Sequence, residues 1–393
     1  MLLYFNPGHE TAVINTSPYY TLPANVLQMQ RDLSFLPAWY GKAEDYVFMN
    51  DDTGKAYIDS LRKIFPKLPK EISLNTITSI SSEIVSLWGI SPQSIHFFSE
   101  INNVHNVHLN IPAWKNEYIA LNSREAARDC LIEIIKELPE ISKNITPHFC
   151  KSIDETELII NSSKYPMLAK APYSSSGRGL LWLSESLTDK EKEILRGILK
   201  KQGCVSLEPA LDKDMDFSMQ FVCTEDGNIR FEGYSHFETN QRGAYQGNYL
   251  YNQERIVELL TEKIPSTLLE NTKQAVLSIL KKNYAALYKG CIGVDMMIYK
   301  ENGRYKLHPC LEINMRCNMG YLSLKLQQNY LAQSSEGKFQ IEYMARKGAV
   351  YEKHIEMERH FPLNVKDGKI ESGYLALCPV SSQSQYAAYV VVD

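Results

Sequence analysis

The chain has 393 residues, of which 44% are hydrophobic and 22% are charged, and its formal net charge is −4. This length allows two or three hydrophobic cores, and the composition excludes an intrinsically disordered or fibrous protein. The sequence contains no long block of Lys or Arg, which argues against nucleic acid or an anionic membrane as the main partner. We therefore expect a small-molecule ligand.

The sequence also indicates a cellular compartment. No apolar segment approaches the roughly 20 residues that span a bilayer, and the apolar start of the chain is too short for a signal peptide and has no basic residue before it. The eight cysteines include no C-x-x-C pair, and most lie within apolar runs, as is typical of free thiols in a reducing compartment. We expect a cytoplasmic protein.

The N-terminal region begins with a short strand and a polar loop. Residues 2–5 are predicted to form a buried strand, and residues 6–10 form the loop at its end. Because such loops bind ligands in open α/β sheets, His9 and Glu10 are candidate substrate contacts. The alternative is a turn with two solvated polar residues.

Three further stretches predict a small α/β domain over residues 1–115. Tyr46–Met49 is expected as a strand, the apolar stretch around residues 81–89 is helix-like, and Ile95–Phe98 continues the alternation of short strands and helices. Such alternation is typical of α/β domains.

A helix and a hairpin follow. Ser123 is the expected N-cap of a helix that runs to about Leu138, with Arg124 in its first turn. A strand ending in Lys170, a small-residue loop over residues 174–179, and a second strand then predict a hairpin. Backbone amides, hydroxyls and a lysine charge suit phosphate groups, although the loop has no Walker pattern and a merely flexible hairpin is the alternative.

The central part of the chain is expected to alternate between helices and strands. A capping-box pattern at Thr188 predicts a helix to Lys201, and a strand containing Glu208 runs into a linker. The loop over residues 240–248 is either a substrate-specificity loop or an ordinary hairpin tip. A long helix from about Pro265 to Lys289 precedes the next motif.

That motif is a β-hairpin over residues 290–316. Asn302-Gly303 predicts a two-residue turn with φ > 0 at both positions. Counting outward places Asp295 opposite Cys310. Because strand side chains alternate, Cys310, Glu312, Asn314 and Arg316 are expected on one face of the second strand, which is also the face of Asp295. Pro309 cannot donate a ladder hydrogen bond, so a bulge there can shift this register by one residue.

The hairpin carries a candidate metal site. In the expected register, Asp295 and Glu312 are diagonal neighbours about 7–8 Å apart. A hard divalent cation fits between two such carboxylates, with the Asn314 amide oxygen as a third ligand. Carboxylates in apolar strands need a partner. A structural cluster with Arg316, or an exposed hairpin with scattered charges, is the alternative.

The order of these pieces resembles the ATP-grasp superfamily of carboxylate–amine ligases. The resemblance covers roughly residues 115–325, and its most specific part is Glu312-Ile-Asn-Met-Arg316. It implies an α/β (α+β grasp) fold in four segments: an N-terminal α/β pre-grasp domain (1–115), a first ATP-grasp lobe with the phosphate-lid hairpin (116–206), a second lobe with the metal site (207–330), and a C-terminal α/β extension (331–393).

The resemblance also implies roles for individual residues. The implied ATP-binding residues are Arg124, Lys170, Ser174, Ser175, Ser176, Gly177, Gly179, Glu208, Pro209, Leu211 and Asp216. Arg124 stands where many relatives have a second phosphate-binding lysine, and Asp212 and Asp214 compete with Asp216 for the ribose. The implied ligands of two Mg²⁺ ions are Asp295, Glu312 and Asn314, the implied catalytic residues are Lys170 and Arg316, and the candidate substrate contacts are His9, Glu10 and Arg242.

The activity that the resemblance implies is ATP-dependent joining of a small-molecule carboxylate to an amine or thiol, through an acyl phosphate, with release of ADP and phosphate. Two alternatives stay open: a phosphotransferase, and a non-catalytic ATP-binding regulator. The sequence names neither substrate, and it leaves the oligomeric state open, with a homodimer as one possibility.

Overall fold

The computed structural model describes residues 1–393 except residues 51, 175–178 and 241–242. The chain forms two compact units, each assembled from separate segments. Unit 1 contains residues 1–115, 246–253 and 316–393, and unit 2 contains residues 116–245 and 254–315. The units divide the chain differently from the four segments expected from the sequence, since residues 246–253 and 316–330 of the expected segment 207–330 belong to unit 1.

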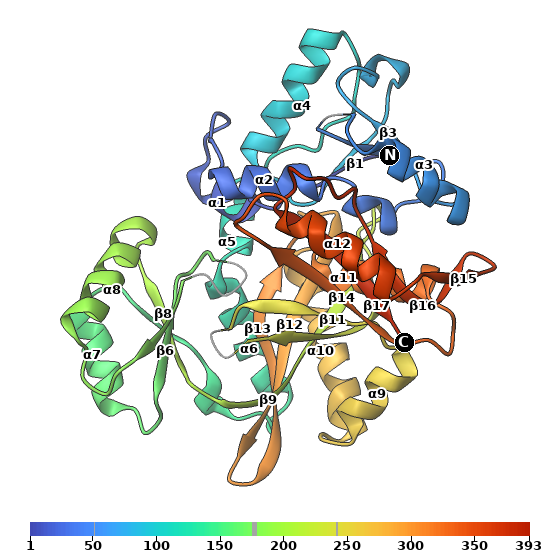
Figure 1. The fold of residues 1–393 in the computed structure, drawn as a ribbon. Helices are drawn as coiled ribbons and strands as arrows, with labels where there is room; N and C mark the ends of the chain where they lie inside the picture. Colours follow the sequence, from blue (N-terminus) through green and yellow to red (C-terminus); the bar gives the residue numbers. More distant parts are fainter. Residues whose placement is uncertain (51, 175–178, 241–242) are drawn as a thin grey trace. The chain divides into compact units, whose positions relative to one another are not determined.

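Unit 1 begins with a parallel four-stranded sheet in the order β3-β2-β1-β4. Its strands are β1 (Leu2–Tyr4), β2 (Tyr46–Phe48), β3 (Lys70–Ile72) and β4 (Val85–Leu87). The helices between and after them are α1 (His9–Asn15), α2 (Ala24–Asp32), η1 (Leu36–Trp39), α3 (Lys55–Ile64), η2 (Ile77–Ser79) and α4 (Pro92–His105), as seen at the blue end of the chain in Figure 1.

The structure corrects one expected element in this sheet. The stretch around residues 81–89 is not helical, because residues 85–87 form β4 and pair in parallel with β1. Val85 and Leu87 are buried in the core beside Phe98, while Ser86 between them is only half-buried. This two-residue alternation is the pattern of a strand. Phe98 in turn belongs to helix α4.

Unit 1 also contains a run of antiparallel strands in the order β11-β14-β17-β16-β15, all but β11 from the C-terminal part of the chain. These strands are β11 (Tyr245–Tyr249), β14 (Gly337–Tyr343), β15 (Asn364–Lys366), β16 (Lys369–Ala376) and β17 (Tyr386–Val392), and the helices are α11 (Met319–Tyr330) and α12 (Ala349–His360). The buried Trp39 indole donates a 2.7 Å hydrogen bond to the Leu377 carbonyl. The N-terminal and C-terminal segments therefore share one packed unit.

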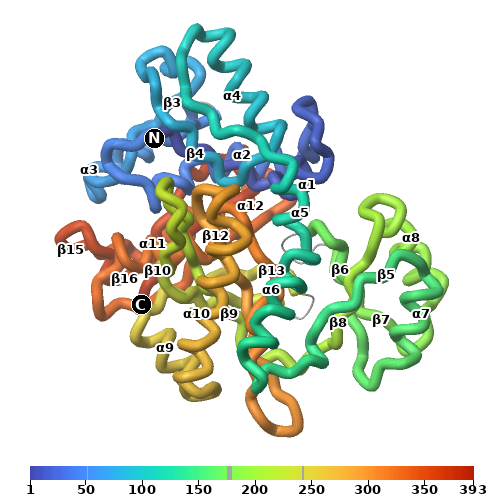
Figure 2. The backbone as a smooth tube through the Cα atoms, turned by 180° about the vertical axis from the view of Figure 1, so that it is seen from behind, coloured from blue at the N-terminus to red at the C-terminus, as the bar shows by residue number. Residues whose placement is uncertain are grey.

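Unit 2 contains two groups of antiparallel strands. The smaller sheet, in the order β5-β8-β6-β7, consists of β5 (His148–Cys150), β6 (Met167–Lys170), β7 (Leu180–Leu183) and β8 (Val205–Pro209). Helices α7 (Ile153–Ser162) and α8 (Asp189–Gln202) lie beside this sheet in Figure 2. They contribute Ile160 and Leu195 to its core. The second group is in the order β13-β12-β9-β10.

The second group of strands carries the expected hairpin. Its members are β9 (Asp212–Cys223), β10 (Ile229–Thr239), β12 (Gly290–Glu301) and β13 (Arg304–Asn314). The helices of unit 2 are α5 (Glu117–Leu121), α6 (Arg124–Glu137), η3 (Lys143–Ile145), α9 (Gln253–Thr261) and α10 (Ser266–Asn283), with α6 packed on β13 and α10 on α6. Asn302 and Gly303 have φ of 51° and 73°, which confirms the predicted turn.

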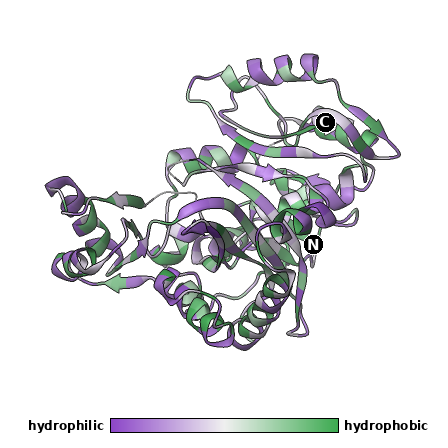
Figure 3. Ribbon diagram, turned by 90° about the horizontal axis from the view of Figure 1, so that it is seen from below, coloured by the Kyte–Doolittle hydropathy of each residue, from purple (hydrophilic) through white to green (hydrophobic). Residues whose placement is uncertain are grey.

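Helix α10 buries Leu269, Thr272, Val276 and Ile279, whose spacing of three and four residues is expected of a helix with one buried face. Hydrophobic and hydrophilic residues are interleaved along the helices in Figure 3. Among the described residues, none of the helices combines the length and the apolar character that crossing a bilayer requires.

The start of α8 confirms a sequence prediction in detail. Thr188 Oγ1 accepts a hydrogen bond from the Glu191 backbone N–H, and the Glu191 carboxylate accepts hydrogen bonds from the backbone N–H and hydroxyl of both Thr188 and Ser184. Burial alone would raise the pKa of Glu191, but these hydrogen bonds lower it to about 2. The capping box therefore ties α8 to the end of β7.

Replacing Glu191 with alanine is expected to lower the free energy of unfolding by about 1 kcal/mol, because two backbone donors lose their acceptor. The folded-state pKa is lowered, so this stabilisation is complete above about pH 4.5 and is lost as the pH falls toward 2. Urea denaturation at pH 7 and at pH 3 measures both effects. The exposed Glu193 on the same helix provides the control, Glu193→Ala; equal stability of the two variants at pH 7 would refute the capping role.

Candidate functional site

The two acidic residues of the hairpin are directly opposite each other. The strands pair Met297 with His308 and Asp295 with Glu312, so that three residues of β13, 309–311, face a single residue of β12. The expected pairing of Asp295 with Cys310 is therefore wrong. Pro309 lies in this bulge and has no N–H for the ladder, which is the physical reason for the irregularity. The shift is two residues, so Asp295 and Glu312 still share a face.

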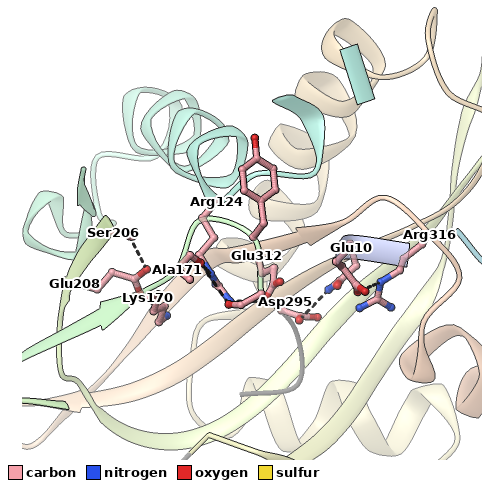
Figure 4. A network of polar contacts seen from close by, with 12 residues as sticks. Glu10, Arg124, Lys170, Ala171, Ser206, Glu208, Asp295, Glu312 and Arg316 are labelled. Carbon is pink, nitrogen blue, oxygen red and sulfur yellow. Dashed lines mark hydrogen bonds and ion pairs between the residues drawn. The ribbon is translucent and has the colours of Figure 1, made fainter. Parts of the chain in front are cut away.

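The predicted metal ligands gather at this point of unit 2. Asp295 and Glu312 are shown in Figure 4. Asn314 Nδ2 donates a 3.0 Å hydrogen bond to Asp295 Oδ2, and the Glu312 side chain is 27% exposed. Two carboxylates and an amide are the hard oxygen ligands that Mg²⁺ prefers, so these residues fit that ion. Within the described parts of the chain, no cluster of three or more His, Cys, Asp or Glu residues could hold a metal. A cation here would need further oxygen ligands from a bound molecule.

Arg124 connects the predicted metal ligands with the predicted lid hairpin of β6 and β7. Ser123 caps α6 as predicted, and its side chain accepts from the Ala126 N–H, which places Arg124 at the first position of the helix. The buried guanidinium is 3.1 Å from Glu312 Oε2 and donates from Nε to the Ala171 carbonyl at 3.2 Å (Figure 4). The Arg124 backbone N–H donates to the Pro172 carbonyl at 3.0 Å. A cation is thus held beside an acid at the base of the lid.

Lys170 and Glu208 form a second cation–acid pair. Both side chains are buried and hydrogen-bonded to each other, and Ser206 Oγ donates to Glu208 Oε1 at 3.2 Å (Figure 4). Burial alone would raise the pKa of Glu208, but Lys170 and Arg124 hold it below its usual value. The two residues come from neighbouring strands. Lys170 of β6 lies opposite Ser206 of β8, and Glu208 of β8 lies opposite Leu168 of β6.

His308 is a residue of this region that sequence reasoning did not identify. It is fully buried on β13, and burial lowers its pKa to about 4 although Glu208 opposes the shift. Its Nδ1 atom has no hydrogen-bond partner among the described residues. The sequence did contain a signal for this residue. His308 and Glu312 are an even number of residues apart on one strand, and strand side chains alternate, so both are expected on one face.

The expected hinge connects the two groups of strands in unit 2. Glu208 and Pro209 end β8, and the chain then enters β9 at Asp212. The Ala210 N–H donates to the Pro166 carbonyl at 2.8 Å, whereas Leu211 is half-buried.

Of the three aspartates predicted as alternative ribose contacts, Asp212, Asp214 and Asp216, Asp216 is the most buried. It lies on β9, 2.6 Å from Lys213 Nζ, and its Oδ2 accepts from the Thr239 hydroxyl at 2.7 Å. Asp214 is instead paired with Lys263 at 2.6 Å. Asp212 is exposed at the start of the strand.

The lid hairpin has the expected antiparallel strands, β6 and β7. Ser174 Oγ donates to the Ala171 carbonyl at 3.3 Å, and Gly179 has a φ of 78°, a conformation that favours glycine. The predicted phosphate contacts Ser175, Ser176 and Gly177 lie outside the described residues, as does Arg242.

The remaining predicted residues lie together in unit 1. Arg316 was expected on β13, but that strand ends at Asn314. Arg316 Nε is 2.6 Å from Glu10 Oε1 (Figure 4). His9 Nδ1 is 3.6 Å from Glu10 Oε2. Burial alone would raise the pKa of Glu10, but Arg316 and His9 hold it well below its usual range. The expected loop over residues 6–10 ends earlier than predicted, because His9 and Glu10 begin helix α1, where they belong to a charged cluster and not to a solvated turn.

Comparison with known proteins finds similarity in structure and not in sequence. No family model matches the chain, and no curated protein matches it. The crystal structure of an N5-carboxyaminoimidazole synthetase from Staphylococcus aureus with ADP is 12% identical, with a TM-score of 0.51, over 100% of this chain and 93% of that one. An N5-carboxyaminoimidazole ribonucleotide synthetase in its ADP complex is 10% identical, with a TM-score of 0.50, over 100% of this chain and 92% of that one. At these identities the likeness establishes the fold alone.

Proposed function

The chain has the ATP-grasp fold, and on this basis we propose that it is an ATP-dependent ligase that joins a carboxylate to an amine. The observation that carries the proposal is the placement of Asp295 directly opposite Glu312, with Arg124 beside them. Two acids and a neighbouring cation are what the triphosphate of a metal–nucleotide complex requires. Two solved structures similar to this chain are ADP complexes, which supports a nucleotide as the ligand.

We propose that the two cation–acid pairs exchange partners when the nucleotide binds. Arg124 and Lys170 are neutralised by Glu312 and Glu208 in the structure described here. Phosphate oxygens would replace these carboxylates as acceptors for the two cations, since charge-assisted bonds to phosphate are strong. Glu312 would then be released to bind the metal together with Asp295 and Asn314. The Mg²⁺ ions, when bound, neutralise phosphate charge.

The proposed reaction follows from charge. A carboxylate oxygen of the acid substrate attacks the γ-phosphorus, and the bond between this phosphorus and the ADP oxygen breaks. The amine nitrogen then attacks the acyl carbon, phosphate leaves with its bonding electrons, and the nitrogen loses a proton. Lys170 and Arg124 orient the phosphates, and no protein nucleophile is needed. Arg316, two residues after Asn314, is proposed to hold the charge of the reacting carboxylate and phosphoryl groups.

The substrates are proposed to be small molecules. His9 and Glu10 are proposed contacts in unit 1, and Arg242 is proposed to contribute from the loop over residues 240–248. A phosphotransferase differs from a ligase in needing one acceptor in place of two substrates, and this difference can be measured.

The test is to incubate the protein with Mg-ATP and pooled carboxylates, with and without pooled amines, and to measure ADP and phosphate. A ligase releases both in equal amounts only when an acid and an amine are present. A phosphorylated acceptor that accumulates as the final product without an amine would contradict ligation. The Asp295→Asn variant serves as the control for contaminating ATPases, since it keeps the side-chain shape and loses the charge.

A further inference from the structure

The charged cluster of unit 1, which contains His9, Glu10 and Arg316, lies where the winding of the parallel sheet reverses direction. The order β3-β2-β1-β4 places β2 on one side of β1 and β4 on the other, so the direction of winding reverses between β1 and β4. In open α/β sheets, ligands bind outside the carboxyl ends of strands at such a point. The loops in question are residues 5–8, after β1, and residues 88–91, after β4.

The two loops are fixed to each other. Asn6 Nδ2 donates to the Gly89 carbonyl at 2.7 Å, and the Gly89 N–H donates to Asn6 Oδ1 at 3.1 Å. A β-carbon on Gly89 would lie 2.3 Å from His9 Cγ, so only glycine leaves room for the imidazole at this point. The sequence between β13 and α11 is also attached here, because the Cys317 N–H donates to the Trp88 carbonyl at 2.8 Å. Arg316 therefore belongs to the same edge of the sheet.

The charges at this edge are both positive and negative, and their side chains are partly exposed. The Glu10 and Arg316 side chains are 17% and 15% exposed, and their closest charged atoms are 2.6 Å apart. A ligand with a single charge would capture one member of this pair and leave the other unpaired in a partly buried position, which is unfavourable. A ligand with one charge of each sign could pair with both members at once.

Two buried side chains nearby have polar atoms that no described residue satisfies. His9 is 2% exposed, and neither of its ring nitrogens has a hydrogen-bond partner within the described residues, although Nδ1 faces Glu10 at 3.6 Å. Asn318 uses Oδ1 to accept from the Tyr321 N–H at 3.0 Å and thereby caps α11, but its buried Nδ2 has no partner in the described chain. Unsatisfied buried polar atoms at functional sites indicate a missing ligand or water.

We propose that this cluster binds a zwitterionic α-amino acid, with the carboxylate on Arg316 and the ammonium group on Glu10. His9 and Asn318 supply further hydrogen bonds to it. The inference rests on the proposed ligase function and assigns its acid substrate: the amino acid's carboxylate becomes the acyl phosphate, and a separate amine displaces the phosphate. Glu10 has a second effect, because an ammonium group held by a carboxylate keeps its proton and cannot act as the nucleophile.

The first test uses ligands and leaves the protein unchanged. Dissociation constants are measured by calorimetry for glycine, D-alanine and the proteinogenic L-amino acids, with and without Mg²⁺ and a non-hydrolysable ATP analogue. The best ligand is then compared with its N-acetyl derivative, which lacks the ammonium charge, and its α-amide, which lacks the carboxylate. Each derivative is expected to bind roughly 10- to 100-fold more weakly.

The second test asks whether Glu10 and Arg316 make the two contacts. The Glu10→Gln variant is expected to bind the amino acid at least about tenfold more weakly, yet to bind the N-acetyl derivative as the wild type does. The Arg316→Lys variant is expected to bind the amino acid more weakly, since the planar bidentate donor is lost, yet to bind the α-amide as the wild type does. Glu71→Gln, which removes a charge paired with Arg62 at 2.8 Å elsewhere in unit 1, is the matched control and should change nothing.

The outcomes separate this inference from the function on which it rests. If the ATP analogue binds but no amino acid does, or if the N-acetyl derivative binds as tightly as its parent, the amino-acid site is refuted and the nucleotide proposal stands. If neither the analogue nor any amino acid binds, both are refuted. Equal losses of parent and N-acetyl derivative in Glu10→Gln would assign Glu10 a structural role only and would overturn its contact with the ammonium group.

Discussion

Replacing Glu312 with glutamine is expected to lower ATP-dependent turnover by roughly 10²–10³, because a metal-bound charge that stabilises the transition state contributes several kcal/mol. Glutamine keeps the shape of the side chain, so the cross-strand position opposite Asp295 is preserved while the charge is lost. A second consequence concerns Arg124, whose partner at 3.1 Å becomes neutral. We expect the Mg²⁺ concentration at half-maximal rate to rise.

The measurement is the initial rate of ADP formation as a function of Mg²⁺ at saturating ATP. Glu301→Gln provides the control, because Glu301 belongs to the same hairpin but pairs with Arg304 beside the turn. Full activity of the Glu312→Gln variant with an unchanged Mg²⁺ dependence would remove this residue from the metal site. Thermal unfolding of both variants verifies that the hairpin remains folded.

Replacing Lys170 with methionine is expected to change both stability and nucleotide binding. Methionine leaves the buried Glu208 without the lysine that now holds its carboxylate, and breaking a buried pair in this way costs about 3–5 kcal/mol of stability. Loss of a charge that contacts phosphate is expected to weaken ATP binding by roughly 10- to 100-fold. Urea denaturation and calorimetric titration with Mg-ATP measure the two effects.

The double variant Lys170→Met/Glu208→Gln separates these two effects. It removes the unpaired charge, so most of the lost stability should return, whereas ATP binding should stay weak because the phosphate contact is still missing. Recovery of wild-type affinity in the double variant would refute a phosphate role for Lys170. In the wild type, the lowered pKa of Glu208 means that the pair stabilises the fold fully above about pH 4.5 and does so less as the pH falls.

Local features were predictable because local rules determine them. The Asn302-Gly303 turn needs two residues with positive φ, and the caps at Ser123 and Thr188 need a short polar side chain before a helix. The two-residue shift at Pro309 could not be predicted, because the size of a bulge depends on how both strands pack. The same applies to the residues around 81–89, where apolar content alone does not distinguish a buried strand from a helix.

The candidate site residues could be predicted from the sequence, but the residues with which they form ion pairs could not. Arg124 meets Glu312 because α6 packs on β13, and the two residues are far apart in the chain. Glu10 and Arg316 meet because the segment after β13 returns to the end of β4. Such pairings depend on tertiary structure, so the sequence supplied candidates and the fold supplied their geometry.

The most direct test of the central claim is a crystal structure with Mg²⁺ and a non-hydrolysable ATP analogue. We predict metal density between Asp295 and Glu312, and β- and γ-phosphates in contact with Lys170 and Arg124, with the Arg124–Glu312 and Lys170–Glu208 pairs opened. A nucleotide bound elsewhere on the chain, or a nucleotide bound while both ion pairs remain closed, would contradict the account.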